Sequence, residues 1–109
     1  MFLFFGYGCS GKKEVTLTVI NRSNRDVDKL HIRYPASQFV MENLEVGIQK
    51  MHTFSIPDSM NFKGAFLYMI EIDDVIRSEG TFGYFSNFYN IRSHYKIMIN
   101  EKFEVKQQD

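Results

Sequence analysis

Three histidines are the side chains in this 109-residue sequence best suited to binding a metal ion or moving a proton near neutral pH. They are His31, His52 and His94. A zinc site needs three or four converging ligands, and no two of these histidines have a spacing typical of zinc ligands. His31 and His94 also fall on the outward phase of the strands predicted below, where a solvated polar residue is expected. We therefore expect no metal site.

The densest acidic group consists of Glu71, Asp73, Asp74 and Glu79. Glu71 and Asp73 share one face of a predicted strand, so their carboxylates could bind Ca²⁺ or act as an acid–base pair. The spacing matches no calcium loop. Aspartates are common in turns, because their side chains hydrogen-bond to nearby backbone. We expect Asp73 and Asp74 to form the turn of a hairpin.

No nucleophile motif points to catalysis. None of the serines lies in a Gly-x-Ser-x-Gly sequence. A short chain that must also fill a core has little surface left for a catalytic cleft. The sequence therefore predicts a protein that is not an enzyme and that needs no cofactor.

The charge balance argues against a nucleic-acid partner. The chain has 13 basic and 13 acidic residues and no basic stripe. A nucleic-acid binder needs such a stripe to displace the counterions around phosphates. We expect no nucleic acid among its partners.

The first thirteen residues change from apolar to basic around the only cysteine. Met1 to Gly8 is mostly apolar, Cys9 follows, and Ser10 and Gly11 precede two lysines. The apolar run is too short to span a bilayer, and one cysteine cannot form an internal disulfide. The segment resembles the end of a bacterial lipoprotein signal, where an apolar run stops at small residues before the cysteine that receives lipid.

This resemblance implies that Cys9 is a lipid-attachment residue and that residues 1–13 form a signal, lipid-attachment and tether segment. Acyl chains on Cys9 would anchor the protein to a membrane, at about 0.8 kcal/mol per buried CH₂. The location would be the bacterial cell envelope, on the periplasmic or surface side. The resemblance covers about a tenth of the chain and says nothing about activity. An alternative stays open, in which residues 2–5 form a first strand and Cys9 is a buried thiol.

From residue 14 the pattern of apolar residues predicts strands. Period-two alternation runs through 15–19, 30–34, 48–56 and 95–99. No segment keeps apolar residues at helical spacing, and strands recur roughly every eight to twelve residues. This pattern predicts an all-β fold, an antiparallel β-sandwich of about seven strands, immunoglobulin-like or similar.

One domain is expected over residues 14–106, followed by a polar tail at 107–109. The segment 65–72 is apolar on both faces until Glu71, which predicts a central strand covered by a layer on each side. Residues 21–26 contain no apolar side chain and predict a turn, so the Asn21-Arg22-Ser23 sequon is interpreted as part of that turn. The predicted core residues are Leu17, Val19, Ile32, Phe54, Phe66, Ile70, Ile97 and Ile99.

A cluster of aromatic residues follows residue 81. Its members Tyr84, Phe85, Phe88 and Tyr89 could line a binding surface, since exposed aromatics supply interface energy. Most of the 17 aromatics must lie in the core, because each buries a large area. Tyr84 and Tyr89 are the better candidates for exposure, because their hydroxyl groups tolerate water.

These observations predict a non-enzymatic exported lipoprotein that acts as a binding or interaction module, similar to the small single-domain lipoproteins of bacteria. The sequence does not identify its protein partner. The alternative is a soluble interaction module, phage-structural or inhibitor-like, in which residues 1–8 belong to the fold. A sugar-binding domain is disfavoured, because the chain lacks Trp.

Overall fold

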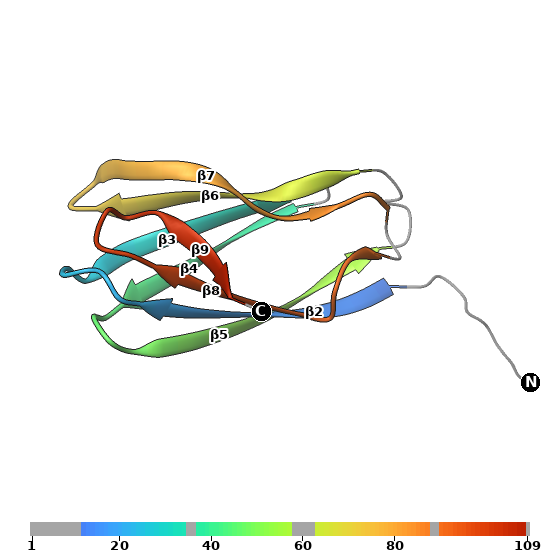
Figure 1. Ribbon diagram of the computed structural model, residues 1–109, viewed down its shortest axis with the longest axis horizontal. Coiled ribbons are helices and arrows are strands. Elements are labelled where there is room, and N and C mark those ends of the chain that lie inside the picture. The colour runs from blue at the N-terminus through green and yellow to red at the C-terminus, as the bar shows by residue number, and fades with distance from the viewer. Residues whose placement is uncertain (1–11, 35–36, 58–62, 88–89, 109) are drawn as a thin grey trace, which may run out of the picture.

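The computed structural model describes residues 12–34, 37–57, 63–87 and 90–108, which form a sandwich of two four-stranded sheets (Figure 1). The strand order is β5-β2-β8-β9 in one sheet and β4-β3-β6-β7 in the other. The strands are β2 (Lys12–Asn21), β3 (Val27–Tyr34), β4 (Ser37–Leu44), β5 (Gln49–Pro57), β6 (Gly64–Ile72), β7 (Val75–Phe85), β8 (His94–Ile99) and β9 (Val105–Gln108). The prediction of an all-β sandwich is confirmed, with eight strands in place of about seven. In these ranges no helix is long and apolar enough to cross a membrane.

The strand β2 has two neighbours of opposite direction. It pairs antiparallel with β5 and parallel with β8, so that Leu17 lies opposite His52 on one side and Tyr95 on the other. All pairs in the other sheet are antiparallel. β2 and β3 lie in different sheets, so the turn between them joins the two layers.

The core lies between the two sheets and follows the predicted alternation. In β2, Val15, Leu17 and Val19 are at most 1% exposed. Seven of the eight predicted core residues are buried in the same way: Leu17, Val19, Ile32, Phe66, Ile70, Ile97 and Ile99. The eighth, Phe54, is only partly buried and packs against the core from β5.

The strand β6 is buried on one face only, so the prediction of a layer on each side is wrong. Phe66 and Ile70 point into the core, but Leu67 on the opposite face is 44% exposed. The strand is central because it lies between β3 and β7 within its sheet. Hydrogen bonding on both edges does not require cover on both faces.

The C-terminal residues 107 and 108 belong to the edge strand β9, although the sequence predicts a polar tail there. Gln107 lies opposite Ile97, and Gln108 lies opposite Lys96. The Gln107 side-chain oxygen accepts the Gly83 N–H at 3.1 Å and so links this edge to β7 of the other sheet. Polar residues carry no alternation signal, but backbone pairing does not require apolar side chains.

The two sheets are also joined where Tyr68 crosses β7. Gly80 lies directly opposite Tyr68, and a Cβ at Gly80 would come within 2.8 Å of the tyrosine hydroxyl oxygen. The space left by the missing side chain lets the Tyr68 ring reach β9, where its hydroxyl accepts the Val105 N–H at 3.3 Å. Glycine at position 80 is therefore a packing requirement.

A second link between the sheets lies at the C-terminal end of β2, where Asn21 is fully buried. Its Nδ2 donates to the carbonyl oxygens of Arg25 at 2.9 Å and Leu44 at 2.7 Å. Its Oδ1 accepts the N–H of Ser23 at 2.9 Å and the Ser23 hydroxyl at 2.6 Å. The residues of the sequon thus form a turn, as predicted, and Asn21 ties that turn to the end of β4.

We expect Gly80→Ala to destabilise the protein by about 1–3 kcal/mol, because the Tyr68 ring must move in a packed core. Urea unfolding followed by circular dichroism measures this cost. In a Tyr68→Ala background the same change should cost clearly less, because the clashing ring is gone. An equal cost in both backgrounds would contradict the steric explanation.

We expect Asn21→Ala to cost at least about 1–3 kcal/mol, because the Leu44 carbonyl and the Ser23 N–H lose their buried partner. The matched control is Asn24→Ala, at an exposed position in the same turn, which should change stability by less than about 0.5 kcal/mol. Equal thermal shifts for the two variants would rule out the proposed role of Asn21.

Candidate functional site

The outward-facing surface of the β4-β3-β6-β7 sheet, here called the outer face, has an apolar floor. Val40 on β4 is 40% exposed and Leu67 on β6 is 44% exposed. Met69, also on β6, is half-buried on the same face as Leu67, and His31 on β3 lies between Met69 and Val40. Apolar side chains gathered on the open face of a sheet are characteristic of an interaction surface.

Charged side chains surround this floor in register. Lys29 lies opposite Glu71, and Arg33 lies opposite Leu67, on the neighbouring strands β3 and β6. Glu79 lies beside Met69 on β7. Within the described ranges, Lys29, Arg33 and Glu79 form no ion pair or side-chain hydrogen bond. Within that part of the chain the outer face thus carries charges of both signs that have no ion-pair partner of their own.

Two hollows lie along the outer face. One, of about 310 Å³, is lined by His31, Arg33, Val40, Met69 and Glu79 among others. The second, of about 570 Å³, shares Arg33 and Leu67 with the first and extends to Tyr84. An apolar floor with polar groups on its rim is the usual construction of a binding surface.

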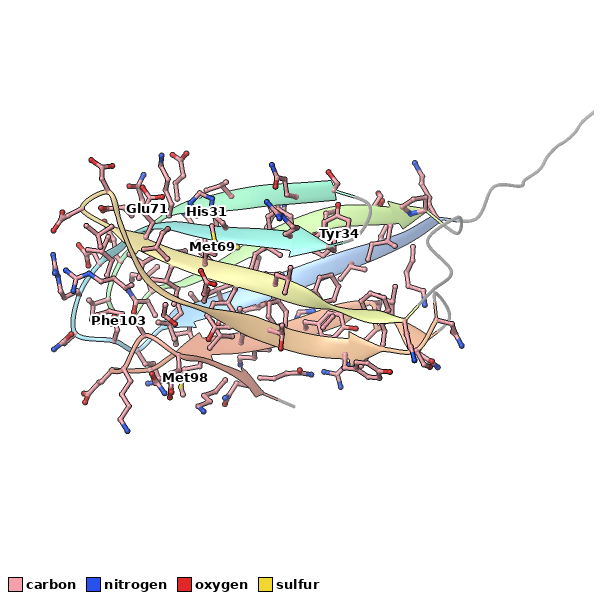
Figure 2. All side chains as sticks on the ribbon, turned by 90° about the horizontal axis from the view of Figure 1, so that it is seen from above. His31, Tyr34, Met69, Glu71, Met98 and Phe103 are labelled. Carbon is pink, nitrogen blue, oxygen red and sulfur yellow. The ribbon has the colours of Figure 1, made fainter. Side chains whose placement is uncertain are left out.

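His31 is anchored within this face. Its Nε2 lies 2.9 Å from Glu71 Oε1, and Figure 2 shows His31, Glu71 and Met69 side by side on β3 and β6. The imidazole side chain is 32% exposed and the carboxylate side chain 16%. This contact fixes Glu71 at one end of the floor.

The other two histidines lie elsewhere and have other neighbours. The His52 ring on β5 stacks on Phe39, with ring centroids 4.2 Å apart. His94 Nε2 on β8 lies 3.2 Å from the Thr18 hydroxyl. In the described part of the chain, no group of three or more His, Cys, Asp or Glu residues could hold a metal ion.

The four acidic residues divide between two places. Asp73 and Asp74 form the β6–β7 turn, whereas Glu71 and Glu79 lie on the outer face. Asp73 and Asp74 have φ angles of 54° and 63°, which is the geometry of a type I′ hairpin turn. The Asp73 N–H donates to Asp28 Oδ2 at 2.7 Å, and its carboxylate pairs with Arg25 at 2.8 Å. The prediction of a hairpin turn is confirmed.

The predicted aromatic surface is divided by a β-bulge. Gly83, with a φ of 65°, lies in a register shift between β6 and β7, and such a bulge re-aims the side chains that follow it. Tyr84 is consequently 71% exposed and Phe85 only 1% exposed. Phe85 as a surface residue is therefore a wrong prediction, because its ring packs in the core beside Phe66.

Three further predicted site residues are Phe88, Tyr89 and Cys9, and they lie outside the described residues.

The sequence also holds a Ser-x-x-Lys pattern at Ser93 and Lys96. Side chains three residues apart in an extended chain point to opposite faces. Tyr95 between them is 3% exposed, so this pattern marks an ordinary strand.

Sequence reasoning missed the outer face. The available signal was the outward phase of 65–72, where Leu67 and Met69 lie, together with the basic residues His31 and Arg33 on the outward phase of 30–34. Those two segments had to be known as neighbours before the pattern could be seen. Pairing between β3 and β6 supplies that knowledge.

Comparison with protein-family models found no match, and comparison with curated proteins and with solved structures found no significant similarity.

We expect the neighbours Tyr84 and Phe85 to respond oppositely to truncation. Phe85→Ala should cost about 3–5 kcal/mol, because it empties a core position. Tyr84→Ala should change stability by less than about 0.5 kcal/mol, because the ring is mostly solvated. Chemical unfolding of both variants measures the difference, and comparable losses would contradict the bulge geometry.

Proposed function

We propose that this protein is a non-enzymatic interaction module of the bacterial cell envelope, anchored by lipid on Cys9 and acting through the outer face. The observation that carries the binding role is the outer face itself, where an exposed apolar floor is surrounded by Lys29, Arg33 and Glu79, which form no ion pair within the described residues. Such a surface fits association with another macromolecule better than it fits bond chemistry.

The arrangement of the strands is compatible with an N-terminal anchor. The strand β2 begins at Lys12, three residues after Cys9 in the sequence. The β2–β3, β4–β5, β6–β7 and β8–β9 turns all lie at the opposite end of the sandwich, on the left of Figure 1. A membrane tether at Cys9 would hold the strands pointing away from the bilayer and leave the outer face accessible along their length.

The anchor is tested with the full chain produced in a bacterial host. We expect it to incorporate a fatty-acid label, to sediment with membranes and to be released by detergent. Cys9→Ser should abolish both labelling and membrane retention, because the thiol is the acyl acceptor. Ser10→Ala is the matched control and should preserve both.

The alternative, a soluble interaction module, predicts a different result when the N-terminal residues are deleted. Every strand in the described ranges pairs within residues 12–108, so deletion of residues 1–11 should leave circular dichroism and cooperative unfolding intact. A deletion that unfolds the protein would mean that residues 1–8 belong to the fold. The lipid-anchor proposal would then fail in favour of a soluble interaction module.

A further inference from the structure

We propose that the partner of the outer face is a second copy of this chain, in a parallel dimer whose two-fold axis runs along the strands between β3 and β6. This inference rests on the proposed binding role of the outer face and does not depend on the lipid anchor.

The position of the axis follows from the register of β3 and β6. A two-fold axis parallel to the strands turns the second copy so that each β3 residue lies over its cross-strand neighbour on β6. Lys29 then faces Glu71 of the second copy, because these two residues are directly opposite within one sheet. By the same rule Arg33 faces Leu67 of the second copy, so its aliphatic stem packs on an apolar side chain.

The charges select this axis over the other axis available to two stacked faces. An axis perpendicular to the strands through His31 would place Lys29 against Arg33 of the second copy, and like charges facing each other oppose association. The parallel axis instead gives Lys29 a carboxylate, twice, by symmetry. It also places Glu79 of the second copy diagonally across from Arg33. Arg33 is level with Leu67, and Glu79 on β7 is level with Met69, the next outward-facing residue of β6. Each of these charges is unpaired within the described part of a single chain, apart from Glu71, which contacts His31.

The apolar floor lies where such a dimer needs it. Leu67 and Met69 are next to the axis, and Val40, at 40% exposure, lies on the flank. The four strands span only about 14 Å from the first to the last, since neighbouring strands are about 4.8 Å apart. The interface is thus at or below the roughly 800 Å² per partner of a standard complex. Coupling of both chains to one membrane would favour association by raising their effective concentration.

The parallel arrangement also suits two anchored chains. A two-fold axis along the strands keeps the N-terminal ends of both β2 strands at the same end of the dimer. Two lipids on Cys9 could therefore enter one bilayer. An axis perpendicular to the strands would direct the two tethers in opposite directions.

The test uses complementary charge reversals in the full chain, carrying two different C-terminal tags and co-expressed in one host. In K29E, Glu at position 29 would face Glu71 of the second copy, and in E71K, Lys29 would face Lys. We expect wild-type chains to co-purify through either tag from a detergent extract. Each variant paired with itself should lose co-purification by roughly tenfold or more, because two repulsive contacts replace two attractive ones.

The decisive sample is K29E co-expressed with E71K. Both contacts are attractive in that mixed dimer, so co-purification should return to near the wild-type level. A substitution that merely damages its own chain cannot be rescued by a partner carrying another damaging substitution. Thermal unfolding of each variant by circular dichroism confirms that the monomers are folded.

Met51→Glu provides the matched control, because Met51 is 60% exposed on the other sheet, and it should leave co-purification unchanged. Leu67→Glu, at the centre of the outer face, should abolish it. The dimer proposal fails if wild-type chains do not co-purify. It also fails if K29E and E71K each still co-purify with themselves, or if K29E does not co-purify with E71K. If the chain is retained at membranes through Cys9 but its tagged copies do not co-purify, the dimer proposal fails and the anchor proposal stands. If Cys9→Ser chains still co-purify and still sediment with membranes, the anchor proposal fails and the dimer proposal stands.

Discussion

The rest of the structure depends on the central position of β2 in its sheet. This strand hydrogen-bonds to β5 on one edge and, in parallel, to β8 on the other. Val15, Leu17 and Val19 point from it into the core and are almost wholly excluded from water. Among the described strands β5 has no other hydrogen-bonded neighbour, so without β2 it would be unpaired there and separated from the pair β8–β9. The N-terminal part of the described chain is therefore a structural centre, and β2 begins at the end of the sandwich opposite the β2–β3, β4–β5, β6–β7 and β8–β9 turns (Figure 1).

Packing in the interior decides what appears on the surface. The Tyr68 ring reaches β9 because Gly80 leaves it room. Three residues later Gly83 introduces the bulge that sends Tyr84 outward and Phe85 inward. A side chain at Gly83 would meet the Phe66 ring at 2.9 Å. Two glycines on β7 thus set both the contact between the sheets and the chemistry of one edge of the outer face.

The outer face gains its character from two strands that are distant in sequence. β3 contributes Lys29, His31 and Arg33, and β6 contributes Leu67 and Met69. Each strand alone is an ordinary sheet strand with one buried face. Side by side, they place Lys29 and Arg33 on β3 next to Leu67, Met69 and the Glu71 carboxylate on β6. Because Lys29 and Glu71 lie opposite each other in register, a two-fold axis along the strands would set each of these opposite charges against the other in a second copy.

The sequence by itself determined the fold class and most of the core, because period-two alternation states which side chains of a strand share a face. It also determined the turn at Asp73 and Asp74, since short polar side chains favour that backbone geometry. It could not determine which strands are neighbours, because β2 and β8 pair across more than 70 positions and no local pattern encodes a long-range partner. For that reason the outward apolar side of β6 was interpreted as a second buried face, and Gln107 and Gln108 as a tail. Phe85 was misplaced because a bulge inverts the alternation on which the assignment rested. Only the tertiary structure decided these points, since burial and edge pairing are properties of where a strand ends up among its neighbours.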